Sequence, residues 1–109
     1  MVPIADIERV LRDMRLAIDA GKFQPVPRRK NMNTLAALGI SWEDAKAEIY
    51  GLTASEYFQG PEADRDFPGT DPLWVFKKNI GGQVIYMKFK VLYLGDGSVR
   101  LVSFHIDEP

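Results

Sequence analysis

The chain contains no cysteine and a single histidine among its 109 residues. The lack of cysteine excludes disulfide bonds, thiolate zinc sites, iron–sulfur clusters and a cysteine nucleophile. One histidine argues against a transition-metal site, because imidazole is the usual nitrogen ligand of such metals. No apolar run approaches the roughly 20 residues of a membrane-spanning helix, and the amphipathic N-terminus is unlike a signal peptide. We therefore expect a cytoplasmic protein that uses no metal and no other cofactor.

The remaining composition is that of an ordinary globular domain. The chain has 14 Lys and Arg residues against 15 Asp and Glu residues, a formal net charge of -1, and 46% hydrophobic residues. A chain of this size can bury about two thirds of the surface that it exposes when unfolded. We expect one domain that spans residues 1–109.

The N-terminal segment predicts one long amphipathic helix near residues 3–20. Apolar side chains recur at helical spacing, charged residues occupy the other face, and Pro3 and Gly21 suit the first turn and the end of the helix. Packing against a sheet explains this stripe better than a partner-binding surface does. The stripe consists of Ile4, Ile7, Val10, Leu11, Met14, Ala17 and Ile18.

Two shorter helices are expected in the middle of the chain. Asn33 is positioned to cap a short helix that ends at Gly39. Ser41 and Asp44 form a capping-box pattern at the start of the next helix, which is expected to end at Gly51.

The following segment predicts a helical turn and then a loop. Thr53-Ala-Ser-Glu56 has the capping-box pattern and opens a turn around Tyr57 and Phe58, which Gly60-Pro61 breaks. From residue 62 to residue 72 the composition becomes acidic, and this stretch is interpreted as a solvated connector.

After the connector the hydrophobic period changes from helical spacing to two. Residues 73–80, 83–94 and 98–106 predict three strands, joined by the turns Gly81-Gly82 and Gly95-Asp96-Gly97. Such strands form an antiparallel meander. With the helices first and the sheet last, the expected fold class is α+β, an antiparallel sheet packed by N-terminal helices.

Strand parity separates an apolar and a polar set of side chains, because successive residues of a strand point to opposite faces. On the middle strand Tyr86, Lys88 and Lys90 oppose an apolar row. On the preceding strand Lys77 opposes Trp74, which we assign to the core. These two strands therefore contribute lysine side chains to one face of the sheet.

The last strand is less regular. Val102 and Phe104 are expected to face the core, which directs Ser103 and His105 to the opposite side. If the apolar sets face the helices, then His105 shares one open sheet face with Tyr86, Lys88 and Lys77.

This polar face has two interpretations. It is either a solvated sheet surface, on which lysines prevent aggregation, or a catalytic surface for RNA. Cleavage of RNA without a metal needs a base for the 2′-hydroxyl, cations for a dianionic phosphorane and an acid for the leaving 5′-oxygen. A tyrosine, a histidine and lysines are sufficient for this chemistry.

The near-zero net charge hides two basic patches. One follows the first helix in a proline-containing segment, residues 22–30, which is expected to be an extended edge or a loop. The other lies on the strands. Such patches bind polyanions through phosphate contacts. The predicted RNA-binding residues are Lys77, Arg28, Arg29, Lys30 and Lys90.

Four ordered runs in the second half of the chain carry a family resemblance. They are Gly51-Leu-Thr-Ala-Ser-Glu-Tyr-Phe58, Leu73-Trp-Val-Phe76, Gly82-Gln-Val-Ile-Tyr-Met-Lys-Phe89 and Leu101-Val-Ser-Phe-His105. With the step Leu38-Gly-Ile40 they cover residues 33–106. In their order and spacing they resemble the MqsR family of bacterial toxins.

The resemblance implies a RelE-like fold and a ribosome-independent mRNA endonuclease, the toxin of a type II toxin–antitoxin system. By the same resemblance, the enzyme needs no metal for catalysis. Its partners would be an mRNA substrate and a cognate antitoxin, a DNA-binding helix-turn-helix protein with or without a zinc domain, and no membrane.

The resemblance also assigns site residues. The family's active-site tyrosine corresponds to Tyr86, and its basic residue after the final Ser-Phe corresponds to His105. Gln59 stands where the best-known member has a catalytic lysine, and Val75 stands where it has a glutamine. Because an imidazole titrates near neutrality, His105 can supply the acid or the base directly. We predict that Tyr86, His105 and Lys88 are catalytic.

Two further hypotheses concern other classes of protein. The same basic face would serve a non-catalytic module that binds RNA or a protein. A purely structural interaction domain would bind no RNA and arrest no growth.

Overall fold

A computed structural model describes residues 2–108 as an α+β fold with a five-stranded mixed sheet. The expected α+β class is confirmed, but the expectation of a purely antiparallel sheet is wrong, because the short first strand runs parallel to its neighbour. The strand order is β1-β5-β4-β3-β2, and every pair is antiparallel except β1 and β5, which run parallel. The elements are α1 (Ile4–Asp19), β1 (Phe23–Pro25), α2 (Arg29–Leu38), α3 (Trp42–Tyr50), the 3₁₀ turn η1 (Ala54–Glu56), β2 (Tyr57–Glu62), β3 (Leu73–Ile80), β4 (Gln83–Val91) and β5 (Val99–Ile106).

Helix α1 confirms the amphipathic pattern. Pro3 is the residue before its first turn, with extended backbone (φ -60°, ψ 142°). Five residues of the apolar stripe are buried, while Arg15 joins the helix to the end of α3 by donating to the carbonyl oxygens of Tyr50 (2.9 Å) and Leu52 (2.6 Å). The buried residues are Ile7, Val10, Leu11, Met14 and Ala17.

Helix α2 begins earlier than predicted. Asn33 is exposed inside the helix, so its assignment as the cap is wrong. Arg28 instead precedes the first turn with extended backbone. The basic residues after Pro27 are good helix formers, and the helix begins as soon as the proline no longer restricts the backbone. Its predicted end is confirmed, because Gly39 adopts a left-handed conformation with φ 68°.

The predicted capping boxes are both present. In α3 the Asp44 backbone N–H donates to Ser41 Oγ (3.2 Å), and the Ser41 N–H donates to the Asp44 carboxylate (2.9 Å). At η1 the Thr53 backbone N–H donates to Glu56 (2.9 Å) in the same way. Polar side chains thus satisfy the free backbone donors at the start of each element.

Strand β2 contradicts the helical turn expected around Tyr57 and Phe58. After η1 the chain becomes extended and pairs with β3, with two register shifts on the way to Glu62. Gly60-Pro61 lies inside this strand, where a proline is normally excluded. The strand tolerates it because β2 is the edge of the sheet and needs no ladder donor at that position.

The meander of β3, β4 and β5 is as predicted, including the two-residue turn at Gly81-Gly82, where both residues have positive φ (60° and 84°). Strand β4 ends at Val91, earlier than expected. Tyr93 therefore lies in the following loop, with its side chain 54% exposed, and its hydroxyl donates to Asp13.

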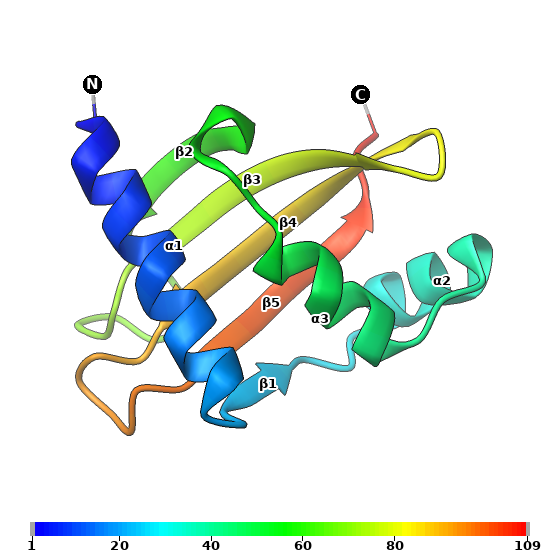
Figure 1. Ribbon diagram of the computed structural model, residues 1–109. Coiled ribbons are helices and arrows are strands. Elements are labelled where there is room, and N and C mark those ends of the chain that lie inside the picture. Colours follow the sequence, from blue (N-terminus) through cyan, green and yellow to red (C-terminus); the bar gives the residue numbers. More distant parts are fainter. Residues whose placement is uncertain (1, 109) are drawn as a thin grey trace.

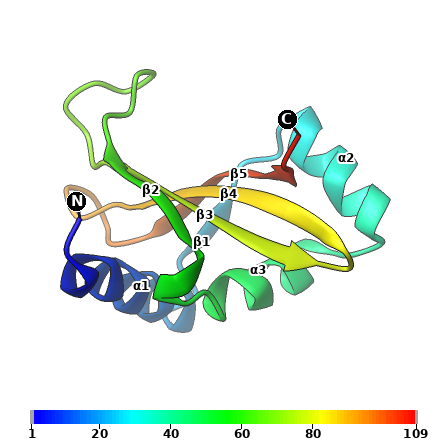
Figure 2. The same ribbon diagram turned by 90° about the horizontal axis from the view of Figure 1, so that it is seen from above.

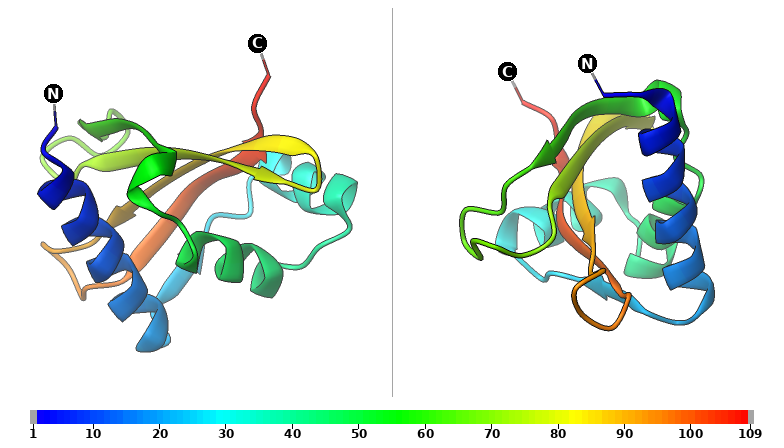
Figure 3. Two further views of the ribbon diagram at one scale, coloured as in Figure 1. Left: turned by 45° about the horizontal axis from the view of Figure 1, so that its top comes forward. Right: turned by 90° about the vertical axis from the view of Figure 1, so that its left-hand side faces the viewer.

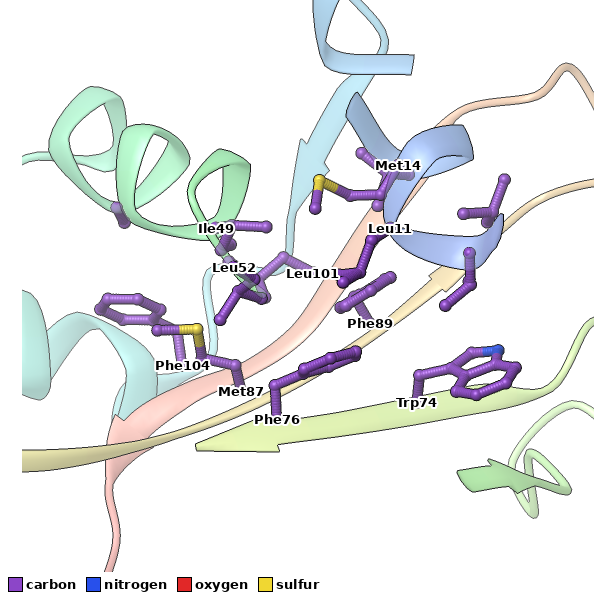
Figure 4. Packing of buried hydrophobic residues seen from close by; sticks show 14 of the residues in the cluster. Leu11, Met14, Ile49, Leu52, Trp74, Phe76, Met87, Phe89, Leu101 and Phe104 are labelled. Atoms are coloured by element: carbon purple, nitrogen blue, oxygen red, sulfur yellow. The ribbon is translucent and has the colours of Figure 1, made fainter. Parts of the chain in front are cut away.

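Helices α1 and α3 cover one face of the sheet, and the core lies between these helices and the sheet (Figure 1). Figure 4 shows side chains of α1, α3 and the strands meeting there. Trp74 belongs to this core, as predicted, and is only 8% exposed. The largest fully buried core side chains include Phe76, Phe89, Phe104, Leu11, Met14, Ile49, Leu52 and Met87. No helix among residues 2–108 has the length and apolar character needed to cross a membrane.

The opposite face of the sheet is flanked by α2 on one side and by the connector between β2 and β3, residues 63–72, on the other (Figures 2 and 3). The prediction that this connector is simply solvated is wrong for two of its acidic residues. Asp64 and Asp71 are buried, at 8% and 7% exposure. Asp64 binds the Lys90 ammonium at 2.7 Å, and Asp71 accepts the Leu94 backbone N–H at 3.0 Å.

Candidate active site

A β-bulge in β5 determines which side chains reach the polar face. Lys88 pairs with Ser103 and Phe89 pairs with Leu101, so Val102 is an extra residue opposite β4. The bulge changes the parity of the strand. The prediction that Val102 faces the core is therefore wrong, because Val102 is half-buried and lines a hollow on the polar side.

After the bulge, the strand presents its residues as predicted. Phe104 is fully buried in the core, and His105 is the direct cross-strand neighbour of Tyr86. The two rings stack at a centroid distance of 5.0 Å with 11° between their planes. The Tyr86 hydroxyl has no hydrogen-bond partner in the part of the chain that the structure describes, which leaves it available to a ligand.

The surroundings of His105 favour its neutral form. Burial lowers the pKa of His105 below its ordinary value of 6.5, and the charges of Lys30 and Arg28 act in the same direction. The contact of Nδ1 with the Ile106 carbonyl oxygen (3.1 Å) and the charge of Asp107 oppose this shift. Since a carbonyl oxygen only accepts, Nδ1 carries the proton, and Nε2 of the neutral ring is left with a free lone pair.

Helix α2 holds β5 on both sides of His105. The Phe104 N–H donates to Asn31 Oδ1 (3.0 Å), and the Ile106 N–H donates to Thr34 Oγ1 (3.2 Å). Asn31 Nδ2 also donates to the carbonyl oxygen of the bulged Val102 (3.0 Å). These side chains replace the neighbouring strand that β1 is too short to provide, and they fix the backbone that carries the imidazole.

A cavity of about 280 Å³ opens at the stacked pair. The same helix start that supports β5 brings Arg28 and Lys30 to its rim, and Lys88 approaches from β4, 5.9 Å from the centre of the Tyr86 ring. The structure therefore brings five of the predicted site residues together around one cavity. Its lining residues are Arg28, Lys30, Asn31, Tyr86, Lys88, Ser103 and His105.

The Lys88 ammonium forms an ion pair with an acidic neighbour, Glu62. It lies 3.4 Å from Glu62 Oε1, and Gln59 donates to the other carboxylate oxygen of Glu62 at 2.9 Å. Both ion-pair partners are partly exposed, so the pair contributes only about 0–1 kcal/mol. A phosphate group can therefore replace Glu62 beside Lys88. Gln59 itself presents an amide, without charge, on the same side of the sheet.

The remaining predicted RNA-binding residues differ in their availability. Lys77 is the cross-strand neighbour of Tyr86, but its ammonium binds Asp107 (2.9 Å) and lies 3.8 Å from the centre of the Phe58 ring. Arg29 is exposed at the first turn of α2 and lines neither hollow described in this section.

The prediction that Lys90 binds RNA from the open face is wrong, because Lys90 is buried. Its side chain is 2% exposed and its ammonium binds Asp64 (2.7 Å) and Thr70 Oγ1 (3.0 Å). The parity argument placed Lys90 on the correct face, but the 63–72 connector folds over that end of the sheet. Lys90 is therefore a structural residue and not a phosphate ligand.

Sequence reasoning missed Asn31 and Glu62 at this site, and it placed Ser103 on the polar face without naming it as a site residue. Ser103 lies two residues before His105 on the same strand, so strand parity was the signal that puts both on one face. Asn31 had no such signal, because its partners belong to β5 and are distant in sequence.

Residues 2–108 contain no group of three His, Cys, Asp or Glu side chains that could hold a metal ion. The polar groups at the cavity are an imidazole, a phenol, an ammonium from each of two lysines, one guanidinium, an amide and a hydroxyl. No protein-family model matches the chain, and no curated protein matches it.

Proposed function

We propose that the chain is an endoribonuclease of the MqsR type with a RelE-like fold, which cleaves cytoplasmic mRNA without a metal and is neutralised by a cognate antitoxin. The observation that carries the proposal is the stacked pair of Tyr86 and His105 in a cavity rimmed by Arg28, Lys30 and Lys88. Proton-transfer groups beside cations are what RNA cleavage through the 2′-hydroxyl requires.

His105 acts as the general base in this scheme. Its free Nε2 takes the proton of the 2′-hydroxyl, and the 2′-oxygen forms a bond to the adjacent phosphorus. The bond between phosphorus and the 5′-oxygen then breaks, and the leaving oxygen takes a proton from the Tyr86 hydroxyl. The products are a 2′,3′-cyclic phosphate and a 5′-hydroxyl end.

The cations stabilise the charge that develops on the phosphorane. Arg28 and Lys30 approach from α2 and Lys88 from β4, so positive groups stand on two sides of the cavity. Fixed charges that surround a dianionic transition state lower its energy more than that of the singly charged diester. Burial, together with the charges of Lys30 and Arg28, lowers the pKa of His105, which suits a base that must accept a proton at neutral pH.

The alternative, a module that binds RNA without cleaving it, rests on Gln59 and Val75. Neither residue supplies a proton or a charge at the two positions where the best-known family member has a lysine and a glutamine. This alternative predicts RNA binding with no cleavage product.

The pH dependence of cleavage tests the role of His105. A base must be unprotonated, so the rate should fall as the pH drops through the pKa of His105 and should reach a plateau at neutral pH. Because burial and the charges of Lys30 and Arg28 lower that pKa, we expect a midpoint below 6.5. The chain has one histidine, so an NMR titration of its ring reports the same pKa without ambiguity. A rate midpoint that differs from the NMR pKa would exclude His105 as the base.

A further inference from the structure

A second, larger hollow of about 930 Å³ continues from the cavity at Tyr86 and His105. The two hollows share Arg28 and Lys88 in their linings, so they form one groove along the polar face of the sheet. The volume lies at the upper end of the roughly 300–1,000 Å³ range of ligand sites. The larger hollow therefore has room for a stretch of chain next to the cleaved bond.

The outer wall of this hollow is a fixed structure. Lys90 Nζ binds Asp64 (2.7 Å) and Thr70 (3.0 Å), and Asp64 also accepts the backbone N–H groups of Asp66 (3.1 Å) and Phe67 (3.2 Å). The connector is thereby attached to β4 through a buried ion pair. Figure 2 shows it projecting from the face of the sheet that α1 and α3 do not cover.

Arginines from three separate parts of the chain line the hollow. Arg28 precedes α2, Arg65 belongs to the connector and Arg100 lies on β5. Among residues 2–108, none of these guanidinium groups has a carboxylate within the 4.0 Å of an ion pair. Guanidinium groups bind phosphates through two parallel hydrogen bonds.

The acidic residues of the hollow are largely neutralised by other contacts. Asp64 is paired with Lys90, and Glu62 binds Lys88 and Gln59. Asp66 is the exposed acidic residue that remains in the lining. The unpaired charge of the hollow is therefore positive.

The connector also offers an aromatic surface. Phe67 lines the hollow and is 56% exposed, and the Lys90 ammonium lies 5.6 Å from the centre of its ring. Exposed aromatic rings in a basic groove are typical stacking positions for the bases of single-stranded nucleic acids.

We propose that this hollow is a binding subsite for single-stranded RNA beside the cleaved bond, in which Arg65 and Arg100 bind backbone phosphates and Phe67 stacks on a base. The subsite deepens the proposed function and rests on it. It explains why a chain with a net charge of -1 keeps several arginines free on one face. An acidic peptide is the competing occupant, and it would make no use of Phe67 as a stacking surface.

The test measures binding of a labelled, 2′-O-methylated RNA of 12 nucleotides, which cannot be cleaved, by fluorescence anisotropy over a series of NaCl concentrations. The double variant Arg65→Gln/Arg100→Gln should bind about tenfold more weakly at low salt, and its salt slope should fall by about 0.7 per arginine. Phe67→Ala should weaken binding by about tenfold with an unchanged salt slope. Arg9→Gln, on the exposed side of α1, is the matched control and should bind like the wild type.

The failure of this inference is distinguishable from that of the proposed function. If the wild type cleaves RNA but the double variant binds with the wild-type affinity and salt slope, the subsite is wrong and the nuclease remains. If the wild type binds RNA without cleaving it and the variants lose affinity as stated, the subsite stands and the nuclease is wrong. An equal loss of affinity in Arg9→Gln would also overturn the subsite.

Discussion

Replacement of His105 by alanine is expected to lower the rate of RNA cleavage by about 10²–10⁴-fold, the usual contribution of a general base. The side chain is half-buried at the surface of the polar face and contributes nothing to the core, so the variant should remain folded. Single-turnover cleavage of a labelled RNA measures the effect, with a circular dichroism melt as the check on folding. Growth arrest on expression should disappear in parallel.

Tyr86→Phe provides the matched comparison for His105→Ala. It removes only the hydroxyl and keeps the ring that stacks on His105. A loss of rate in this variant therefore reports proton transfer or phosphate contact and not a change in packing. Full activity in both variants would refute the assignment of the site.

The second large effect concerns stability. Lys90→Ala is expected to lower the free energy of unfolding by about 3 kcal/mol, because it leaves the Asp64 carboxylate buried without its partner. This is the lower end of the usual range, since a single connector covers the pair. Chemical denaturation with urea measures the change. The 63–72 connector should also lose its attachment to β4, because Lys90 also binds Thr70.

The pH dependence of this effect has a defined sign. The hydrogen bond from Lys90 lowers the pKa of Asp64 below its ordinary value of 3.8. The stabilisation is therefore complete above the pKa of the unfolded chain and is lost as the pH falls through that of the folded protein. The double variant Lys90→Met/Asp64→Asn removes both charges, keeps an oxygen that accepts the Asp66 and Phe67 backbone N–H groups, and should recover most of the stability. A double variant no more stable than Lys90→Ala would show that the connector is held by other contacts.

The sequence predicted most of the core and the boundaries of α1 and α3 because those signals are local. Ser41 with Asp44 and Thr53 with Glu56 are capping pairs three residues apart, and both form. The alternation in β4 identified its buried and polar faces correctly. Strand parity also placed Tyr86 and His105 on one face of the sheet, but it did not predict that they are direct cross-strand neighbours.

The features that were missed depend on contacts between distant segments. No residue near Val102 in the sequence predicts the bulge, which is stabilised by the hydrogen bond from Asn31 of α2 to the Val102 carbonyl oxygen. Strand β2 was hidden by Pro61, a residue that only an edge strand tolerates. Lys90 was assigned to the open surface because strand parity does not reveal what covers a face. Its partner Asp64 belongs to a segment whose composition is that of a loop.

The measurement that tests the central claim most directly is incubation of the purified protein with a long mRNA in EDTA, followed by chemical mapping of the new ends. We predict discrete cuts that carry 2′,3′-cyclic phosphate and 5′-hydroxyl ends and that are absent with His105→Ala. Intact RNA in the presence of folded protein that is free of antitoxin would contradict this prediction.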